Sequence, residues 1–133
     1  MENKSKKILT EISAGELLDK MSILEIKLEK IANKDSQEKL KKEYKILKDN
    51  QNSTIKMEGK INDLFKLLKN INLKLWDIED NLRICEKNKN FGKEFTDLAR
   101  KVYLNNDKRS KIKSDINKAL DSNIVEIKQY ASY

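Results

Sequence analysis

The chain has 133 residues, with 29 Lys and Arg against 22 Asp and Glu, and a formal net charge of +7. It contains no proline, no histidine, three glycines and one cysteine. An internal disulfide is therefore excluded, the commonest general base and zinc ligand is missing, and a protein of many short strands would lack its turn residues. We expect one all-α domain over residues 13–133, preceded by a flexible N-terminal segment over residues 1–12.

The first predicted helix, at about residues 14–33, opens with a capping box formed by Ser13 and Glu16. Ile23 and Ile26 lie off its main apolar stripe, so this helix is expected to contact neighbours on more than one side. The main stripe alternates between spacings of four and three, the period of a coiled coil: Leu17, Met21, Leu24, Leu28 and Ile31.

A second capping box, Asp35 with Glu38, predicts the start of the next helix, which continues through Leu47. The polar residues 49–53 follow it. They form either a loop or a solvated part of one continuous helix, because no glycine or proline lies among them.

The clearest pattern in the sequence predicts a helix from about Ser53 to Lys89. A second stripe of Leu73, Trp76 and Ile84 lies on another of its faces, which places this helix at the centre of a bundle or in an oligomer interface. The main stripe alternates three and four residues apart: Ile61, Leu64, Leu68, Ile71, Leu75, Ile78, Leu82 and Cys85.

A sharp turn at residues 88–92 leads into a fourth helix, whose apolar stripe is interrupted by polar residues 105–109. These polar residues either begin a fifth helix or form a polar layer inside one long helix. Asp121 and Ser122 are expected to end the helix, and the tail over residues 123–133 carries enough apolar side chains to dock on the bundle.

Together these elements predict an all-α, antiparallel bundle of four to five helices around one long central helix, with coiled-coil-like packing. The second apolar face of the central helix makes a dimer an expected alternative to a monomer. Apolar runs are only two or three residues long, so we expect a cytoplasmic protein with no membrane partner.

Only three of the 29 basic residues are arginines: Arg83, Arg100 and Arg109. Because the chain otherwise uses lysine, we expect these three arginines at positions that need a planar, bidentate hydrogen-bond donor. The lysines are interleaved with glutamates along the chain, which is typical of solvated helix faces. Nucleic acid stays an alternative partner, and it would require the lysines to converge on one face.

Polar residues at apolar positions mark a candidate ligand-binding cluster. Asp80 lies four residues from both Trp76 and Ile84, and a carboxylate desolvated on that stripe needs a partner. The candidate residues are Asp80, Arg83, Arg100, Asn106, Asp107 and Arg109. Two interpretations stay open, a buried salt-bridge layer that fixes helix register and a binding site for a small anion.

No catalytic residue, metal ligand or cofactor follows from the sequence. Cys85 has no histidine to activate it and is expected to be a small buried side chain. Arg83 and Lys87 interleave the acidic residues of the long helix, which favours ion pairs within the helix over a magnesium site. An enzyme acting at Asp80, Arg83 and Arg109 is retained as an alternative.

Several motifs resemble those of a family of uncharacterised all-helical proteins of bacteria and phages. They are ISAGELLDKMSILEIK at residues 12–27, LWDIEDNLR at 75–83, ARKVY at 99–103, NDKR at 106–109 and EIKQY at 126–130. The resemblance implies a helical protein without an assigned activity, loosely associated with surface-polysaccharide and glycosyltransferase genes. We therefore expect a non-catalytic interaction or accessory protein that binds a protein partner or a second copy of itself.

Overall fold

The computed structural model describes residues 3–133 as four α-helices without any strand. The helices are α1 (Ala14–Lys30), α2 (Lys34–Thr54), α3 (Lys60–Lys87) and α4 (Lys93–Ala119). The all-α prediction is confirmed, and residues 1 and 2 of the predicted flexible segment lie outside the described residues. Within residues 3–133, no helix is both long enough and apolar enough to cross a membrane.

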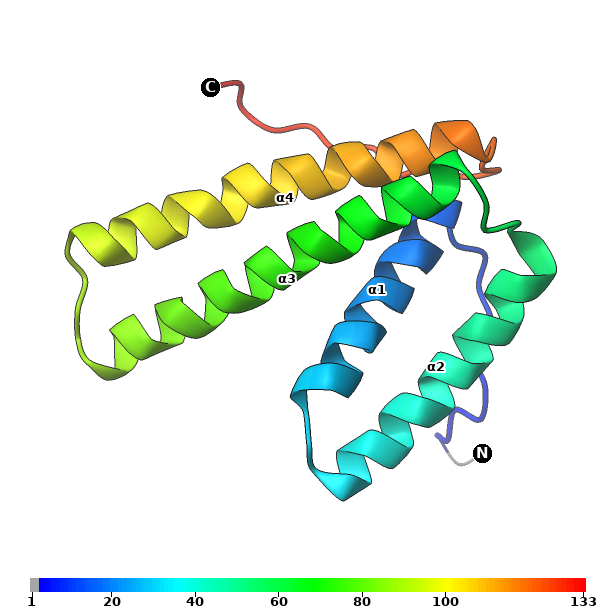
Figure 1. Ribbon diagram of the computed structural model, residues 1–133, viewed down its shortest axis with the longest axis horizontal. Coiled ribbons are helices and arrows are strands. Elements are labelled where there is room, and N and C mark those ends of the chain that lie inside the picture. The colour runs from blue at the N-terminus through cyan, green and yellow to red at the C-terminus, as the bar shows by residue number, and fades with distance from the viewer. Residues whose placement is uncertain (1–2) are drawn as a thin grey trace.

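The four helices form two antiparallel hairpins of unequal length (Figure 1). α3 and α4 make the longer hairpin, and α1 and α2 make a shorter one that sits against one end of it. Only α1 has its backbone close to all three other helices. The centre of the fold is therefore the 17-residue helix α1, and not the long helix α3 as the sequence analysis expected.

The core lies where α1 crosses the α3–α4 hairpin. The first half of the stripe predicted along α3, from Ile61 to Ile71, is buried there, and Leu18 of α1 and Ile116 of α4 complete the cluster. Ile26 is also buried, which agrees with the expectation that the first helix has neighbours on more than one side. The buried cluster consists of Leu18, Ile61, Leu64, Leu68, Ile71 and Ile116.

The Ser13 half of the capping box predicted for α1 is confirmed, whereas the Glu16 carboxylate pairs with Lys113 and Lys20. The capping box predicted for α2 is wrong. The Ser13 hydroxyl accepts the backbone N–H of Glu16 at 3.1 Å. At the start of α2 the cap is Asn33, whose side-chain oxygen accepts the N–H of Ser36 at 3.0 Å, and Asp35 already lies inside the helix. A cap must precede the first helical residue, and Asn33 meets that condition with an equally good side-chain acceptor.

The boundary between α2 and α3 falls later than the sequence pattern indicates. Residues 49–53 continue α2, so the polar stretch is part of a helix; its side chains are exposed except that of Gln51, which is 2% exposed. The long helix begins at Lys60 instead of Ser53. Gly59 precedes it with φ +54°, a backbone conformation that residues with a Cβ rarely adopt, and this glycine allows the chain to turn.

The polar residues 105–109 lie inside α4, so the interpretation as one long helix is confirmed and a fifth helix is wrong. The predicted turn at residues 88–92 is present between α3 and α4. α4 ends at Ala119, close to the end predicted at Asp121 and Ser122. Asp121 has φ 48° just beyond the helix.

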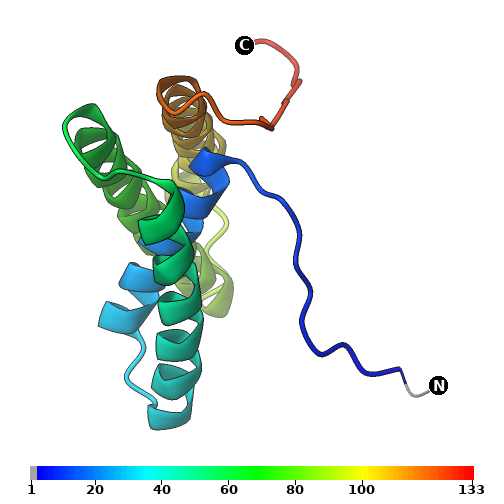
Figure 2. The ribbon, with the colours of Figure 1, turned by 90° about the vertical axis from the view of Figure 1, so that its right-hand side faces the viewer.

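Two segments outside the helices leave the body at the same end (Figure 2). We call residues 3–12 the N-terminal segment and residues 123–133 the C-terminal segment. They touch at their base, where the Asn123 side-chain amide donates to the Glu11 carboxylate at 2.7 Å. The C-terminal segment then returns along α4, whereas the N-terminal segment points away from the helices.

Candidate functional site

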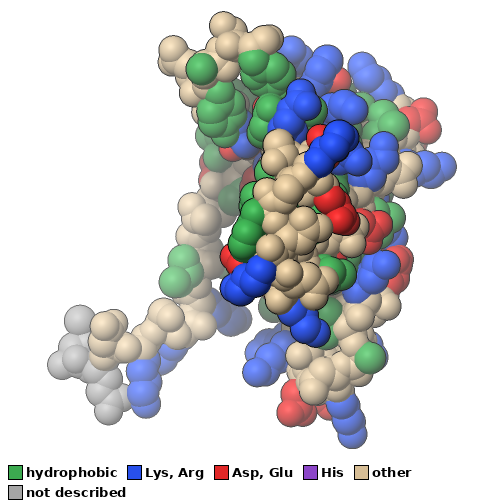
Figure 3. All heavy atoms as spheres, turned by 90° about the vertical axis from the view of Figure 1, so that its left-hand side faces the viewer, with side chains coloured by type: hydrophobic (Ala, Val, Ile, Leu, Met, Phe, Trp, Pro, Cys, Tyr) green, Lys and Arg blue, Asp and Glu red, His purple; other side chains and the backbone are tan. Residues whose placement is uncertain are grey.

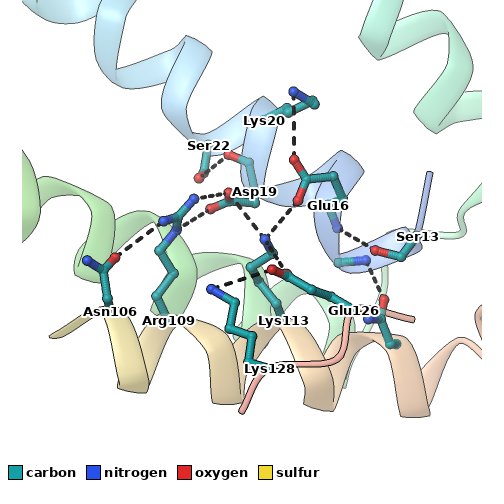
Figure 4. A network of polar contacts seen from close by, with 12 residues as sticks. Ser13, Glu16, Asp19, Lys20, Ser22, Asn106, Arg109, Lys113, Glu126 and Lys128 are labelled. Atoms are coloured by element: carbon teal, nitrogen blue, oxygen red, sulfur yellow. Dashed lines mark hydrogen bonds and ion pairs between the residues drawn. The ribbon is translucent and has the colours of Figure 1, made fainter. Parts of the chain in front are cut away.

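Two polar stripes face each other where α1 meets α4 (Figure 4). On α1 the stripe is Gly15, Asp19 and Ser22, spaced four and three residues apart. On α4 it is Arg109, Lys113 and Asn117, spaced four residues apart. Such spacings place each set on one side of its helix. Gly15 and Asp19 meet the stripe of α4, whereas Ser22 binds Asn72 of α3.

Asp19 is the centre of this arrangement, which we call the Asp19 cluster. Its side chain is only 2% exposed. Arg109 donates to both carboxylate oxygens, from Nε at 3.0 Å to Oδ1 and from Nη2 to Oδ2. Asn72 of α3 donates to Oδ1 at 2.9 Å and to the Ser22 hydroxyl at 2.8 Å. A bidentate guanidinium is among the strongest partners that a buried carboxylate can have.

Lys113 binds three carboxylates from three parts of the chain. Its ammonium lies 2.8 Å from Glu16 of α1 and 3.3 Å from Glu126 of the C-terminal segment. Asp19 is 3.8 Å away. The Lys113 side chain is 9% exposed, so this ion pair network ties the start of α1, the end of α4 and the C-terminal segment together.

The titration of these groups follows from the network. Burial by itself would raise the pKa of Asp19, but the hydrogen bonds from Arg109 and Asn72 and the charges of Arg109 and Lys113 outweigh it and lower the pKa. Burial likewise opposes the charged form of Lys113, but the hydrogen bond to Glu16 and the negative charges of Asp19 and Glu16 outweigh it and raise the pKa. Both groups are therefore charged at neutral pH.

Gly15 sets how closely α1 approaches α4. Its backbone N–H donates to the Asn117 side-chain oxygen at 2.7 Å. A Cβ at this position would lie 2.6 Å from the backbone oxygen of Lys113, closer than real contacts allow. The glycine is needed because the two helix backbones are nearly in contact here.

Four of the six candidate residues line one groove between α1, α3 and α4, with a volume of about 510 Å³. They are Asp80, Arg83, Asn106 and Arg109, and Trp76 forms part of the same wall. Arg100 and Asp107 lie elsewhere: Arg100 is exposed on α4, and Asp107 accepts the Tyr133 hydroxyl.

The charges around this groove differ from what the sequence analysis expected. Asp80 is exposed and has no ion pair within the described residues, so its carboxylate is not desolvated. Arg83 pairs with Glu79 of its own helix at 2.7 Å and does not reach Asp80. Asp80 is therefore exposed although it lines the groove.

Asp19, Lys113 and Glu126 are not among the candidate residues predicted from the sequence. A signal for Asp19 was available, since Ile26 had already indicated a second contact face on the first helix. Stepping back from Ile26 by four and three residues reaches Ser22 and Asp19, so a carboxylate lies on that face. No sequence pattern indicates that Arg109, 90 residues later, is its partner.

Every buried side-chain nitrogen and oxygen of the described residues has a hydrogen-bond partner. Within residues 3–133, no group of three or more His, Cys, Asp or Glu side chains is placed to hold a metal ion. The Asp19 cluster therefore joins helices through charges that already neutralise one another.

Comparison with known proteins places the chain in a family. No curated protein and no solved structure matches it. A family model matches residues 8–133, a range that contains the Gly15 contact, the Asp19 cluster and all four helices. The chain belongs to this family, which is described as a family of unknown function, DUF6165.

Proposed function

We propose that the chain is a non-catalytic helical interaction protein whose two terminal segments bind a protein partner. One observation carries the proposal. Of the twelve large hydrophobic side chains that are exposed in the described residues, seven lie on the N-terminal and C-terminal segments. These seven are Ile8, Leu9, Ile124, Val125, Ile127, Tyr130 and Tyr133.

The degree of exposure supports binding by these segments. Ile8 is 80% exposed, Leu9 91% and Ile127 83%. Single exposed apolar side chains are ordinary on protein surfaces, whereas a group gathered on neighbouring segments is typical of an interaction site. The segments start from one contact, Asn123 with Glu11, so one partner can reach both.

An anion-binding site at Asp80, Arg83 and Arg109 has less support. The groove of about 510 Å³ has a size that suits a small ligand. However, Asp19 neutralises Arg109 and Glu79 neutralises Arg83, which leaves the carboxylate of Asp80 as the unpaired charge. A groove with that balance of charge disfavours an anion.

A nucleic-acid interface also has less support. Lys and Arg side chains are spread over the face in Figure 3, with Asp and Glu among them. Several lysines of the described residues form ion pairs with acidic residues of the same helix, such as Lys45 with Asp49 and Lys93 with Asp97. Nucleic-acid binding usually depends on a basic face without such pairing.

The family resemblance narrows the proposed partner. Because similar helical proteins are associated with surface-polysaccharide and glycosyltransferase genes, we expect the partner to be a protein of surface-polysaccharide synthesis or a second copy of this chain. The helical body then acts as an accessory that holds the terminal segments in place.

The test is co-purification of the tagged full chain from its own cells, with a second, differently tagged copy present. We expect a specific protein or the second copy to be retained by the wild type and lost from the variant Ile127→Lys. The matched control is Ile46→Lys, because Ile46 is 59% exposed on α2, away from both segments. Retention of the same proteins by all three chains, or of none by any, would overturn the proposal.

A further inference from the structure

The groove between α1, α3 and α4 has the size and the lining of a small-molecule site. Its volume is about 510 Å³, within the range of pockets that enclose small ligands. Apolar side chains from two helices form much of the lining: Ile23 and Ile26 of α1, and Leu75 and Trp76 of α3. In such pockets a few polar groups select the ligand, so the polar groups of this groove indicate its ligand class.

The polar lining carries one negative charge that the protein itself does not neutralise. Arg109 is paired with Asp19, which is 2% exposed (Figure 4). Arg83 is paired with Glu79 at 2.7 Å. The Asp80 side chain has no ion pair and no hydrogen bond within residues 3–133. The groove therefore offers one free carboxylate to a ligand, and a cation complements it.

The free carboxylate lies next to an aromatic ring. Trp76 and Asp80 are four residues apart on α3, and both line the groove. Side chains at this spacing are neighbours on a helix, with Cβ atoms about 5–6 Å apart. The Trp76 side chain is half-buried, so part of its ring stays open to a ligand. A cation bound to Asp80 therefore lies beside the indole, which attracts cations more strongly than the other aromatic side chains.

We propose that this groove binds a small organic cation, an ammonium ion that carries an apolar group. The ammonium donates hydrogen bonds to the Asp80 carboxylate beside the Trp76 ring, and the apolar group lies against Ile23 and Leu75. A metal ion is disfavoured, because metal ions need several oxygen ligands and the groove has one free carboxylate. None of the residues that line the groove belongs to the terminal segments, so the inference is independent of the proposed function.

The experiment uses the fluorescence of Trp76, which is the only tryptophan of the chain and lines the groove. The full chain is titrated with hexylammonium. Hexanol and hexanoate are the matched probes, since they share the apolar tail but are neutral and negatively charged. We expect a saturable change in fluorescence with hexylammonium, and binding at least about tenfold weaker for the two other probes.

The matched variants are Asp80→Asn and Asp77→Asn. Both remove one negative charge from α3, but Asp77 does not line the groove. Asp80→Asn should weaken hexylammonium binding about tenfold or more, because Asp80 accepts the hydrogen bonds of the ammonium. Asp77→Asn should change it by less than about twofold, because solvent and salt screen an exposed charge outside the groove. Both side chains are exposed, so both variants should fold, which circular dichroism checks.

Several results would overturn the inference. They are a wild type with no saturable response to hexylammonium, hexanol or hexanoate binding as tightly as hexylammonium, and equal losses in the two variants. A protein that co-purifies with the wild type and is lost from Asp80→Asn would assign the carboxylate to a basic side chain of that protein instead. A protein retained through Ile127 by a chain that binds no hexylammonium would overturn this inference and leave the proposed function standing.

Discussion

The two ends of the α3–α4 hairpin carry the same stripe of apolar residues, spaced three and four apart. They differ in which other helices pack on that stripe. At the inner end α1 crosses the hairpin, and Leu68 and Ile116 are fully buried. At the outer end, residues 82–101, Figure 1 shows no other helix beside α3 and α4, and Cys85 is the one buried apolar residue of that range. A stripe of period 3.5 therefore predicts a contact face, and a third helix is needed to bury it fully.

The largest expected difference between the two ends is in the free energy of unfolding that is lost when a leucine is replaced by alanine and leaves a cavity. Leu68→Ala should lower the free energy of unfolding by about 2–5 kcal/mol, because Leu68 is fully buried. Leu82→Ala at the outer end should cost about half as much or less, since Leu82 is only half-buried. Urea unfolding of both variants measures this, and equal losses would contradict the division into two ends.

The close approach of α1 to α4 should make Gly15→Ala costly. Its Cβ would meet the Lys113 backbone oxygen at 2.6 Å, so the helices must move apart, at a cost of about 1–3 kcal/mol. Gly92→Ala at the outer end is the matched control, because its nearest contact would be Asn90 at 3.6 Å. Thermal unfolding should show a clear loss for Gly15→Ala alone; similar melting temperatures for both variants would argue against a tight crossing.

Acid should weaken the inner end more than the outer one. The pKa of Asp19 is lowered in the folded protein, so the stabilisation from Asp19 is present above its unfolded pKa of roughly 3.9 and is lost as the pH falls through the lowered value. The free energy of unfolding of Asp19→Asn should therefore depend less on pH in the acid range. Asp97→Asn removes an exposed carboxylate that pairs with Lys93, and its pH profile should stay close to that of the wild type.

The smallest effect is expected for the exposed arginine of the outer end. Arg83→Ala should change the free energy of unfolding by no more than about 0.5 kcal/mol, because the Arg83 side chain is 72% exposed and its pair with Glu79 is solvated. Chemical denaturation of this variant beside Arg109→Ala provides the comparison. A loss as large as that of Arg109→Ala would mean that Arg83 makes a stabilising interaction beyond its solvated pair with Glu79.

The sequence predicts the local features of this fold, such as helix caps and apolar stripes. It does not predict that α1 crosses the α3–α4 hairpin. The cap at Ser13 and the stripe from Ile61 to Cys85 follow from spacing alone, because capping and periodicity are local. The turn at Gly59 was missed because one glycine beside an apolar repeat does not disclose its φ angle. The partners Asp19 and Arg109 are 90 residues apart, so only the folded chain brings them together.

The most direct test of the Asp19 cluster is a double-mutant cycle on Asp19→Ala and Arg109→Ala, with stability measured by denaturation and no ligand added. Arg109→Ala leaves the buried Asp19 carboxylate without its main partner and should cost about 3–5 kcal/mol, whereas Asp19→Ala leaves the partly exposed Arg109 and should cost less. The double variant should cost less than the two losses added together, by roughly 1–3 kcal/mol, because the two side chains stabilise each other. Strictly additive losses, or an Arg109→Ala protein as stable as the wild type, would contradict a structural role for the cluster.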